Sequence, residues 1–245
     1  MDIPRIFTIR ESSHRVHNPI DATKLATLGG ALGIEPGATA LDLACGTGEM
    51  LCTWARDHGL IGTGVDLSSV FIERARARAT ELGVDVAFHH GDASQHVARE
   101  RVDLVSCLGA TWIGGGLEGT IALLDRSLKP GGLMVIGEPY WLSEPPDEAV
   151  AACHVTREDG FGSLPELLER YDDLGYDLVE MVLADKDSWD RYAAAQWLNL
   201  RRWADANPAD EMVAEVRAEL RTAPRDHVRY QREYLGWGAF ALMQR

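Results

Sequence analysis

The stretch LDLACGTGEM, residues 41–50, places an acidic side chain at the end of an apolar run and two glycines just after it. The apolar run is typical of a buried strand. Gly46 and Gly48 carry no Cβ, so the main chain there can pass close to a ligand, and a helix that follows would point its N-terminal N–H groups at the same place. The stretch predicts a strand, a ligand-binding turn and a helix; a tight turn that binds nothing is the alternative.

Strands and helices alternate on either side of this stretch. The alternation indicates βαβ units and a mostly parallel sheet with helices on both faces. The predicted strands are 40–44, 61–67, 84–90, 102–109 and 133–139, and the predicted helices are 20–33, 48–59, 68–83 and 117–128, with a turn at 129–132.

The second half of the chain is less regular. The expected fold is one doubly wound α/β domain, residues 1–245, with a mostly parallel seven-stranded sheet. Residues 1–20 would form an N-terminal arm, and residues 186–232 a helical insertion that covers the carboxyl edge of the sheet as a lid. The predicted elements here are a proline-containing loop at 140–149, a helix at 163–175, a strand at 176–184, two helices within 186–222 separated at 206–208, and a final strand at 234–245.

The formal net charge of the 245 residues is −14. This charge argues against nucleic-acid binding, which depends on Lys and Arg side chains that neutralise phosphates. No apolar run approaches the roughly 18 residues of a membrane span, and the charged N-terminus is unlike a signal peptide. We expect a cytoplasmic protein without nucleic-acid or membrane partners, and the sequence does not predict its oligomeric state.

The cysteines and histidines do not indicate a metal site. The four cysteines contain no CxxC pair and are interpreted as reduced thiols, not as a disulfide framework or zinc ligands. His89 and His90 are adjacent, so in a strand their side chains would point to opposite faces. We therefore predict no metal.

Two further carboxylates follow the next strands of the predicted sheet. Asp66 ends the second strand, where a carboxylate can accept hydrogen bonds from both hydroxyls of a ribose; capping the helix from Ser68 is its alternative role. Asp92 ends the third strand, where an adenine amino group could donate to it, although aspartate is common in turns. A dinucleotide is disfavoured because Leu51 stands where the G-x-G-x-x-G fingerprint has its third glycine.

Four stretches resemble, in the right order, the motifs of class I S-adenosylmethionine-dependent methyltransferases. They are LDLACGTGEM, GVDLS at 64–68, GDA at 91–93 and LKPGGLMVIGEP at 128–139. The chain ends, MDIPRIFTI and GWGAFALMQR, resemble a bacterial subgroup of mostly uncharacterised members. One departure is Ala44, where the family often has glycine. The resemblance implies methyl transfer from S-adenosylmethionine and leaves the acceptor open.

The resemblance implies that each strand end contacts a different part of the cofactor. The loop after the first strand would line its methionine part, and the end of the second would bind the ribose and flank the adenine. The end of the third would contact the adenine edge, and the end of the fourth would lie near the sulfonium. The candidates, in that order, are Asp42, Ala44, Cys45, Gly46, Thr47 and Gly48; Asp66, Leu67 and Ser68; Asp92 and Ala93; and Leu108 and Gly109.

Methyl transfer from a sulfonium is an in-line displacement, so orientation and exclusion of water matter most. A base is needed only when the acceptor must lose a proton; His17, Glu138 and Tyr140 are the candidates, and structural bonds are the alternative for the first two. We expect a small-molecule acceptor; a non-catalytic protein that binds S-adenosylmethionine or S-adenosylhomocysteine is the alternative. Acceptor-pocket candidates, some of which packing would also explain, are His14, Asn18, Trp112, Trp141, Trp189 and Tyr192.

Overall fold

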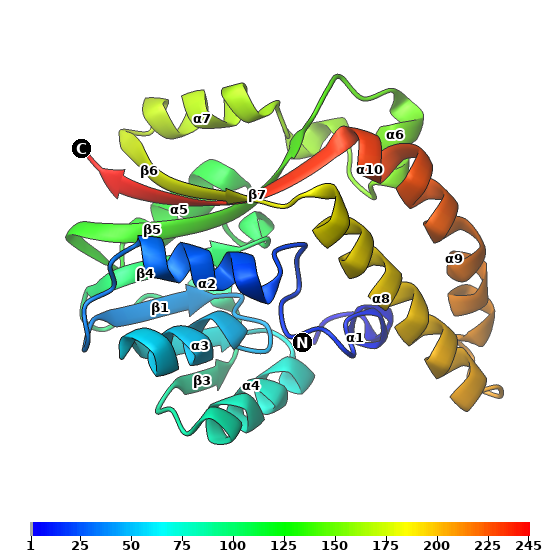
Figure 1. Ribbon diagram of the computed structural model, residues 1–245, viewed down its shortest axis with the longest axis horizontal. Helices are drawn as coiled ribbons and strands as arrows, with labels where there is room; N and C mark the ends of the chain where they lie inside the picture. The colour runs from blue at the N-terminus through cyan, green and yellow to red at the C-terminus, as the bar shows by residue number, and fades with distance from the viewer. Residues whose placement is uncertain (1) are drawn as a thin grey trace.

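One mixed sheet of seven strands forms the centre of the structure. The computed structural model describes residues 2–245 (Figure 1), and its strands lie in the order β3-β2-β1-β4-β5-β7-β6. Neighbouring strands from β3 to β5 run parallel, whereas β7 runs antiparallel to both β5 and β6. The strands are β1 (Thr39–Leu43), β2 (Ile61–Asp66), β3 (Ala87–His90), β4 (Val102–Leu108), β5 (Leu128–Trp141), β6 (Tyr176–Leu183) and β7 (Leu235–Gln244).

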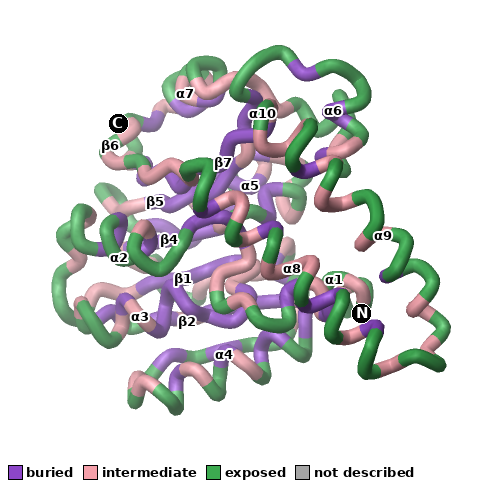
Figure 2. Tube along the Cα trace, turned by 45° about the vertical axis from the view of Figure 1, so that its right-hand side comes forward, coloured by how far each residue is buried: buried purple, intermediate pink, exposed green. Residues whose placement is uncertain are grey.

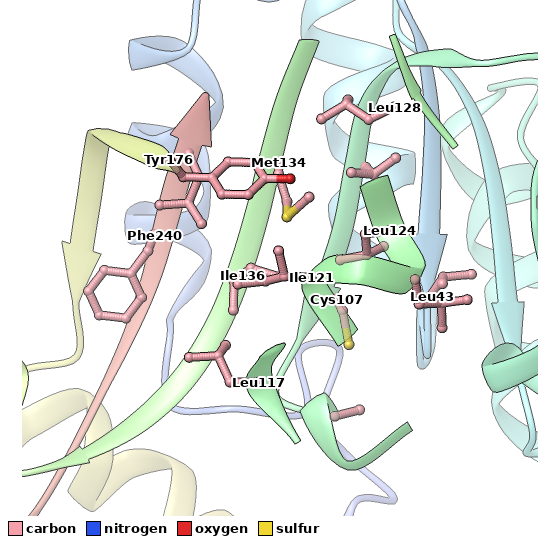
Figure 3. Packing of buried hydrophobic residues seen from close by; sticks show 14 of the residues in the cluster. Leu43, Cys107, Leu117, Ile121, Leu124, Leu128, Met134, Ile136, Tyr176 and Phe240 are labelled. Atoms are coloured by element: carbon pink, nitrogen blue, oxygen red, sulfur yellow. The ribbon is translucent and has the colours of Figure 1, made fainter. Parts of the chain in front are cut away.

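Helices cover both faces of the sheet (Figure 1). Each face has its own apolar core: Leu28 and Trp54 belong to one, and Leu117 and Phe240 to the other, which Figure 3 shows. Figure 2 shows that buried residues concentrate in the sheet between these layers. A parallel sheet requires such burial on both sides. The first face carries α2 (Ala22–Ala31), α3 (Glu49–His58) and α4 (Ser69–Leu82), and the second carries α5 (Leu117–Asp125) and α7 (Leu164–Asp173).

Glycine and serine fix where the helices begin at the carboxyl edge of the sheet. Helix α3 starts directly after Gly48, whose φ of 69° is left-handed. Ser68 caps α4, because its Oγ accepts the N–H of Phe71 at 3.3 Å. A side-chain cap of this kind contributes about 1 kcal/mol to helix stability. Both helix N-termini are therefore held beside the ends of β1 and β2.

The N-terminal arm and the helices before β7 pack together at one end of the sheet (Figure 1). Ile9 of the arm clusters with Leu200, Ala204 and Val216 in a small separate core. No helix within residues 2–245 has the length and hydropathy to cross a bilayer, and the same residues contain no group of three or more potential metal ligands. The elements not yet named are α1 (Arg5–Arg10), α6 (Asp147–Ala152), α8 (Lys186–Ala206), α9 (Val213–Asp226), α10 (Arg232–Tyr234), the 3₁₀ turns η1 (Ala93–Gln95), η2 (Thr111–Gly114) and η3 (Arg157–Asp159), and the π-helical turn η4 (His227–Gln231).

The predicted fold class is confirmed: the sheet has seven strands, is mostly parallel and carries helices on both faces. Two local predictions are wrong. Residues 129–132 lie within β5, which bulges there, because β4 advances two residues from Val102 to Leu104 while β5 advances five from Leu128 to Leu133. The predicted loop 140–149 includes the first turn of α6, where two acidic residues suit a helix N-terminus. The N-terminal arm contains the short helix α1 (Arg5–Arg10), in which the hydrophobic residues are too few to show a helical repeat.

Candidate cofactor and acceptor pocket

A cleft of about 1010 Å³, its open mouth included, lies at the carboxyl ends of β1 to β4. Ligands bind at this edge in open α/β sheets. One wall consists of the loops after these strands, between residues 42 and 113, and we call it the strand-end wall. The other consists of Ile3, Phe7 and residues 15–18 of the N-terminal arm, and we call it the arm wall.

Asp66, at the end of β2, is the most constrained carboxylate of the strand-end wall. Its Oδ2 accepts the N–H of Gly46 and its Oδ1 accepts the N–H of Ser68, each at 2.8 Å. The residue is 7% exposed, and burial raises the pKa of its carboxyl although both N–H groups oppose the rise. A carboxylate offers about four lone-pair sites, so each oxygen can accept another hydrogen bond from a ligand.

The loop between β1 and α3 has a main-chain conformation that side chains rarely adopt. Ala44 and Gly46 have φ values of 60° and 55°. A Cβ on Gly46 would lie 2.9 Å from Nδ1 of His17, so the arm packs on the loop only because this residue is glycine. Asp42, just before the loop, accepts the Ser106 hydroxyl at 2.8 Å, and burial raises the pKa of its carboxyl to about 7.

His17 brings the arm wall against the strand-end wall. Its ring packs on Phe71 of α4, with 4.2 Å between the ring centroids. Burial lowers the pKa of His17 to about 4, although nearby Glu11 opposes the shift, so the ring is uncharged at neutral pH. Its Nε2 is buried and has no hydrogen-bond partner among residues 2–245. Buried polar atoms are normally paired, so this nitrogen is available to a ligand.

A buried carboxylate fastens the arm to the helical insertion. Glu11 is fully buried, and its Oε1 accepts the Tyr192 hydroxyl at 2.9 Å and the Gln196 side-chain amide at 2.6 Å, both from α8. Nδ1 of His14 lies 2.9 Å from Oε2, as an ion-pair contact rather than an aligned hydrogen bond. Burial alone would raise the pKa of Glu11, but the contacts with His14 and Tyr192 outweigh it and lower that pKa.

Comparison with known proteins places this geometry in a family. A methyltransferase-domain model matches residues 40–132, which include the loop, Asp66 and Asp92. The crystal structure of an S-adenosylmethionine-dependent methyltransferase from Geobacter sulfurreducens, in complex with S-adenosylhomocysteine, is 59% identical, with a TM-score of 0.97 over 100% of this chain and 99% of that one. A second from Thiobacillus denitrificans, in complex with the same compound, is 60% identical with a TM-score of 0.97 over 100% of both chains. The uncharacterized protein YjhP of Escherichia coli K12 is 58% identical over 100% of both chains.

This chain belongs to the S-adenosylmethionine-dependent methyltransferases. It is an enzyme, and its cofactor is S-adenosylmethionine. The predictions of family, activity and cofactor from the sequence are confirmed.

Most of the cofactor candidates line the pocket of this methyltransferase. Gly48 and Ser68 do not: Gly48 packs under Phe88, where a Cβ would come within 2.4 Å of the ring, and Ser68 is the buried cap of α4. Asp92 lines the pocket while its side chain accepts the N–H of Ser94 at 2.9 Å. The lining candidates are Asp42, Ala44, Cys45, Gly46, Thr47, Asp66, Leu67, Asp92, Ala93, Leu108 and Gly109, together with His17, Asn18 and Trp112.

Two candidate catalytic residues lie outside the pocket. Side chains two apart in a strand point the same way, so Glu138 and Tyr140 share the face of β5 that carries Ile136 and packs against α5 and α7. Glu138 is buried and accepts the Thr111 hydroxyl at 2.8 Å, and burial raises the pKa of its carboxyl to about 7. The ring of Tyr140 packs over Gly236. Neither side chain lines the cleft.

Four candidates for the acceptor pocket also lie elsewhere. His14 and Tyr192 contact Glu11, Trp189 packs against two apolar clusters, and Trp141 belongs to the cluster beside α6. Aromatic residues at helical spacing serve a packed face as well as a pocket lining, and packing accounts for Trp189 and Tyr192. Residues 186–232 supply no lining residue, so the insertion affects the pocket only through the arm.

Several lining residues are absent from the sequence-based candidates. Ile3, Phe7 and Val16 come from the arm, and Phe71 comes from the first turn of α4. The sequence contains one indication for Phe71: it is apolar and lies at the start of the helix that follows Asp66, the candidate ribose ligand. The arm residues had none, because their position depends on contacts with α8 and α9.

Proposed function

We propose that this methyltransferase acts on a small molecule that binds at the mouth of the cleft. The observation that carries the proposal is the pair of walls, strand ends and arm, which together bound a cleft of about 1010 Å³. Small-molecule sites are typically clefts of this kind, lined mainly by apolar side chains with a few polar groups. The net charge of −14 adds support, because a nucleic-acid acceptor requires a basic surface.

The residues at the ends of β1 to β3 fit an adenosyl group. Each oxygen of Asp66 retains an acceptor site for a ribose hydroxyl, and the absence of a Cβ on Gly46 lets His17 of the arm pack against the loop. The shape and the polar groups of the strand-end wall therefore suit the cofactor of the family. We propose that residues 44–47 bind its methionine part, Asp66 its ribose, and Asp92, Ala93 and Leu67 its adenine, with Asp42, Leu108 and Gly109 completing the set.

When bound, S-adenosylmethionine supplies an electrophilic methyl group on a sulfonium. The chain itself has to align the acceptor and exclude water, and alignment of this kind contributes on the order of 7–11 kcal/mol. The arm wall supplies apolar cover through Ile3, Phe7 and Val16. The Thr47 hydroxyl donates to the carbonyl of Arg15 at 2.6 Å and so joins the arm to the loop. Arm and loop would thus hold the acceptor between them.

His17 is the one of the three catalytic candidates that lines the pocket. Its ring is uncharged at neutral pH, and its free Nε2 can form a hydrogen bond with an acceptor hydroxyl or amine. A pKa of about 4 makes the ring a weak base, and a general base works best with a pKa near the operating pH. We therefore propose that His17 orients the acceptor rather than removing its proton outright.

A transfer assay without a preselected acceptor tests the small-molecule proposal. The protein is incubated with S-adenosylmethionine that carries a radioactive methyl group and with a bacterial extract separated by ultrafiltration into small molecules and macromolecules. The proposal predicts a labelled small-molecule product that separates from S-adenosylmethionine by chromatography, and none when the enzyme has been heat-denatured. Label in proteins or nucleic acids alone contradicts it.

A further inference from the structure

The mouth of the cleft carries an exposed tryptophan. Trp112 lines the pocket and is 66% exposed, although a large apolar side chain is stabilised by burial. Ile113 lies beside it, and Ile3 and Phe7 belong to the facing arm wall. Exposed apolar side chains that gather around a cleft mark a binding surface. We call these four residues the apolar rim.

Trp112 lies in a turn that several hydrogen bonds hold in place, so its exposure is not a result of local disorder. It lies in η2, where the Thr111 hydroxyl donates to Glu138 and the N–H of Gly116 donates to the Thr111 carbonyl at 3.1 Å. The N–H of Gly114 donates to the Thr120 hydroxyl at 3.1 Å, and a Cβ on Gly114 would lie 2.2 Å from the Thr120 nitrogen. The turn is therefore packed directly on the start of α5, and it presents the indole at a fixed place.

The basic side chain near the rim already has partners. Among residues 2–245, Arg15 is the one Lys or Arg that lines the cleft. It pairs with Glu81 at 3.2 Å and with Glu49 at 3.9 Å. Glu49 in turn accepts two hydrogen bonds from Arg78, each at 2.7 Å. An anionic acceptor would find no free positive charge there.

The acidic side chains of the cleft are also engaged. Asp42 accepts from Ser106, and Asp92 accepts from Ser94. Asp66 accepts from two main-chain N–H groups and is assigned to the ribose by the proposed function. The proposed function assigns all three aspartates to the cofactor, and Glu49 is paired with Arg78, so a cationic acceptor would find no unassigned carboxylate in the cleft. Burying a charge without a partner is costly, so both signs of charge are disfavoured at the rim.

From these observations, and on the basis of the proposed function, we infer that the methyl acceptor is an uncharged molecule with a flat apolar ring that stacks on Trp112. Aromatic rings gain from stacking in addition to the area that they bury. The arm wall would contact the opposite face or edge of the ring through Ile3 and Phe7.

The test uses three probes that share one ring and differ only in charge. They are naphthalenes that carry a hydroxymethyl, a carboxylate or an aminomethyl group at the same position, titrated calorimetrically at pH 7 into protein saturated with S-adenosylhomocysteine. The hydroxymethyl compound should bind at least about tenfold more tightly than either charged compound. Trp112→Ala should weaken its binding about tenfold, and Trp112→Phe should restore most of the affinity.

Leu198→Ala is the matched control, because Leu198 is 48% exposed and lies outside the pocket. It should leave the binding of all three probes unchanged. Equal or tighter binding of a charged probe, no binding of the neutral probe, or an unaltered affinity in Trp112→Ala would overturn the inference and leave the proposed function standing. Failure of the folded protein to bind S-adenosylhomocysteine would remove the proposed function and the inference together.

Discussion

Buried carboxylates on the two sides of the pocket have pKa values shifted in opposite directions. At the strand ends and beneath them, Asp42, Asp66 and Glu138 are buried, and burial raises the pKa of each carboxyl. In the arm, Glu11 is equally buried, yet its contacts with the protein outweigh burial and lower its pKa. The difference separates two roles. Glu11 is held by α8 through its Oε1 and fixes the position of the arm, whereas Asp42 and Asp66 line the pocket and keep acceptor capacity that a ligand can use.

Removing the carboxylate of Glu11 should have the largest effect on the free energy of unfolding. Glu11→Ala leaves the Tyr192 hydroxyl, the Gln196 amide and His14 without their partner, and we expect a loss of about 3 kcal/mol in the free energy of unfolding. Urea unfolding measures this loss. Hydrogen exchange should show faster exchange in residues 3–18, while β1 and β2 stay protected.

Glu11→Gln serves as the control for this comparison. The amide oxygen can still accept from Tyr192, but the carboxylate oxygen that lies 2.9 Å from Nδ1 of His14 is lost, so the loss of stability should be intermediate. If neither variant changes exchange in the arm, Glu11 does not hold the arm in place, and the contrast between the two walls fails.

Removing a strand-end carboxylate should stabilise the protein in a pH-dependent way. Glu138 has a pKa of about 7 in the folded chain and an ordinary value near 4.5 when unfolded, so the folded state binds its proton more tightly and stability falls as pH rises between these values. Glu138→Gln does not ionise and can still accept from Thr111. We expect little difference from wild type below pH 4 and a gain of up to about 3 kcal/mol at pH 8.

Urea unfolding at the two pH values checks this prediction, and Asp42→Asn offers a second case because the pKa of Asp42 is also about 7. A loss of stability at pH 8 in both variants would mean that these carboxylates are stabilised as anions, as Glu11 is.

The smallest effect is expected for an exposed ion pair that joins the same two regions as Glu11. Arg5 of the arm pairs with Asp210 at 2.8 Å, and its side chain is 53% exposed. Water and salt screen such pairs, so Arg5→Ala should change the free energy of unfolding by less than about 1 kcal/mol. A loss as large as that of Glu11→Ala would show that the surface contacts, not the buried carboxylate, fasten the arm.

The strand-end wall could be predicted from the sequence because its signals are local. The glycines that follow Asp42, the carboxylate that ends β2 and the short GDA turn each report on the few residues around them, and parallel strands bring these ends to one edge. The same reasoning explains the confirmed sheet. The bulge in β5 was not predicted, because a pair of glycines in a sequence indicates a turn. The pair does not tell whether the strand continues through it, as β5 does.

The arm wall could be predicted only in part: His17 and Asn18 were candidates and line the pocket, whereas Ile3, Phe7 and Val16 were not, because distant residues position the arm. Arg10 bonds Glu219 and Glu11 bonds Tyr192, which are 209 and 181 positions further along the chain. Hydrophobic periodicity also does not distinguish an aromatic residue that lines a pocket from one that packs in a core, so Trp112 and Trp189 were given the same role. Only the fold separates the exposed Trp112 from the partly buried Trp189.

The central claim is that Asp66 holds the adenosyl part of the cofactor, and calorimetric titration of S-adenosylhomocysteine into Asp66→Asn tests it most directly. This change keeps the shape of the side chain and removes its charge. The amide nitrogen of asparagine cannot accept, so one of the main-chain hydrogen bonds from Gly46 and Ser68 is lost as well, and affinity should fall about 100-fold. Asp103→Asn is the matched control: Asp103 also accepts a main-chain N–H but lies outside the pocket, so affinity should not change. Wild-type affinity in a folded Asp66→Asn variant would contradict the account.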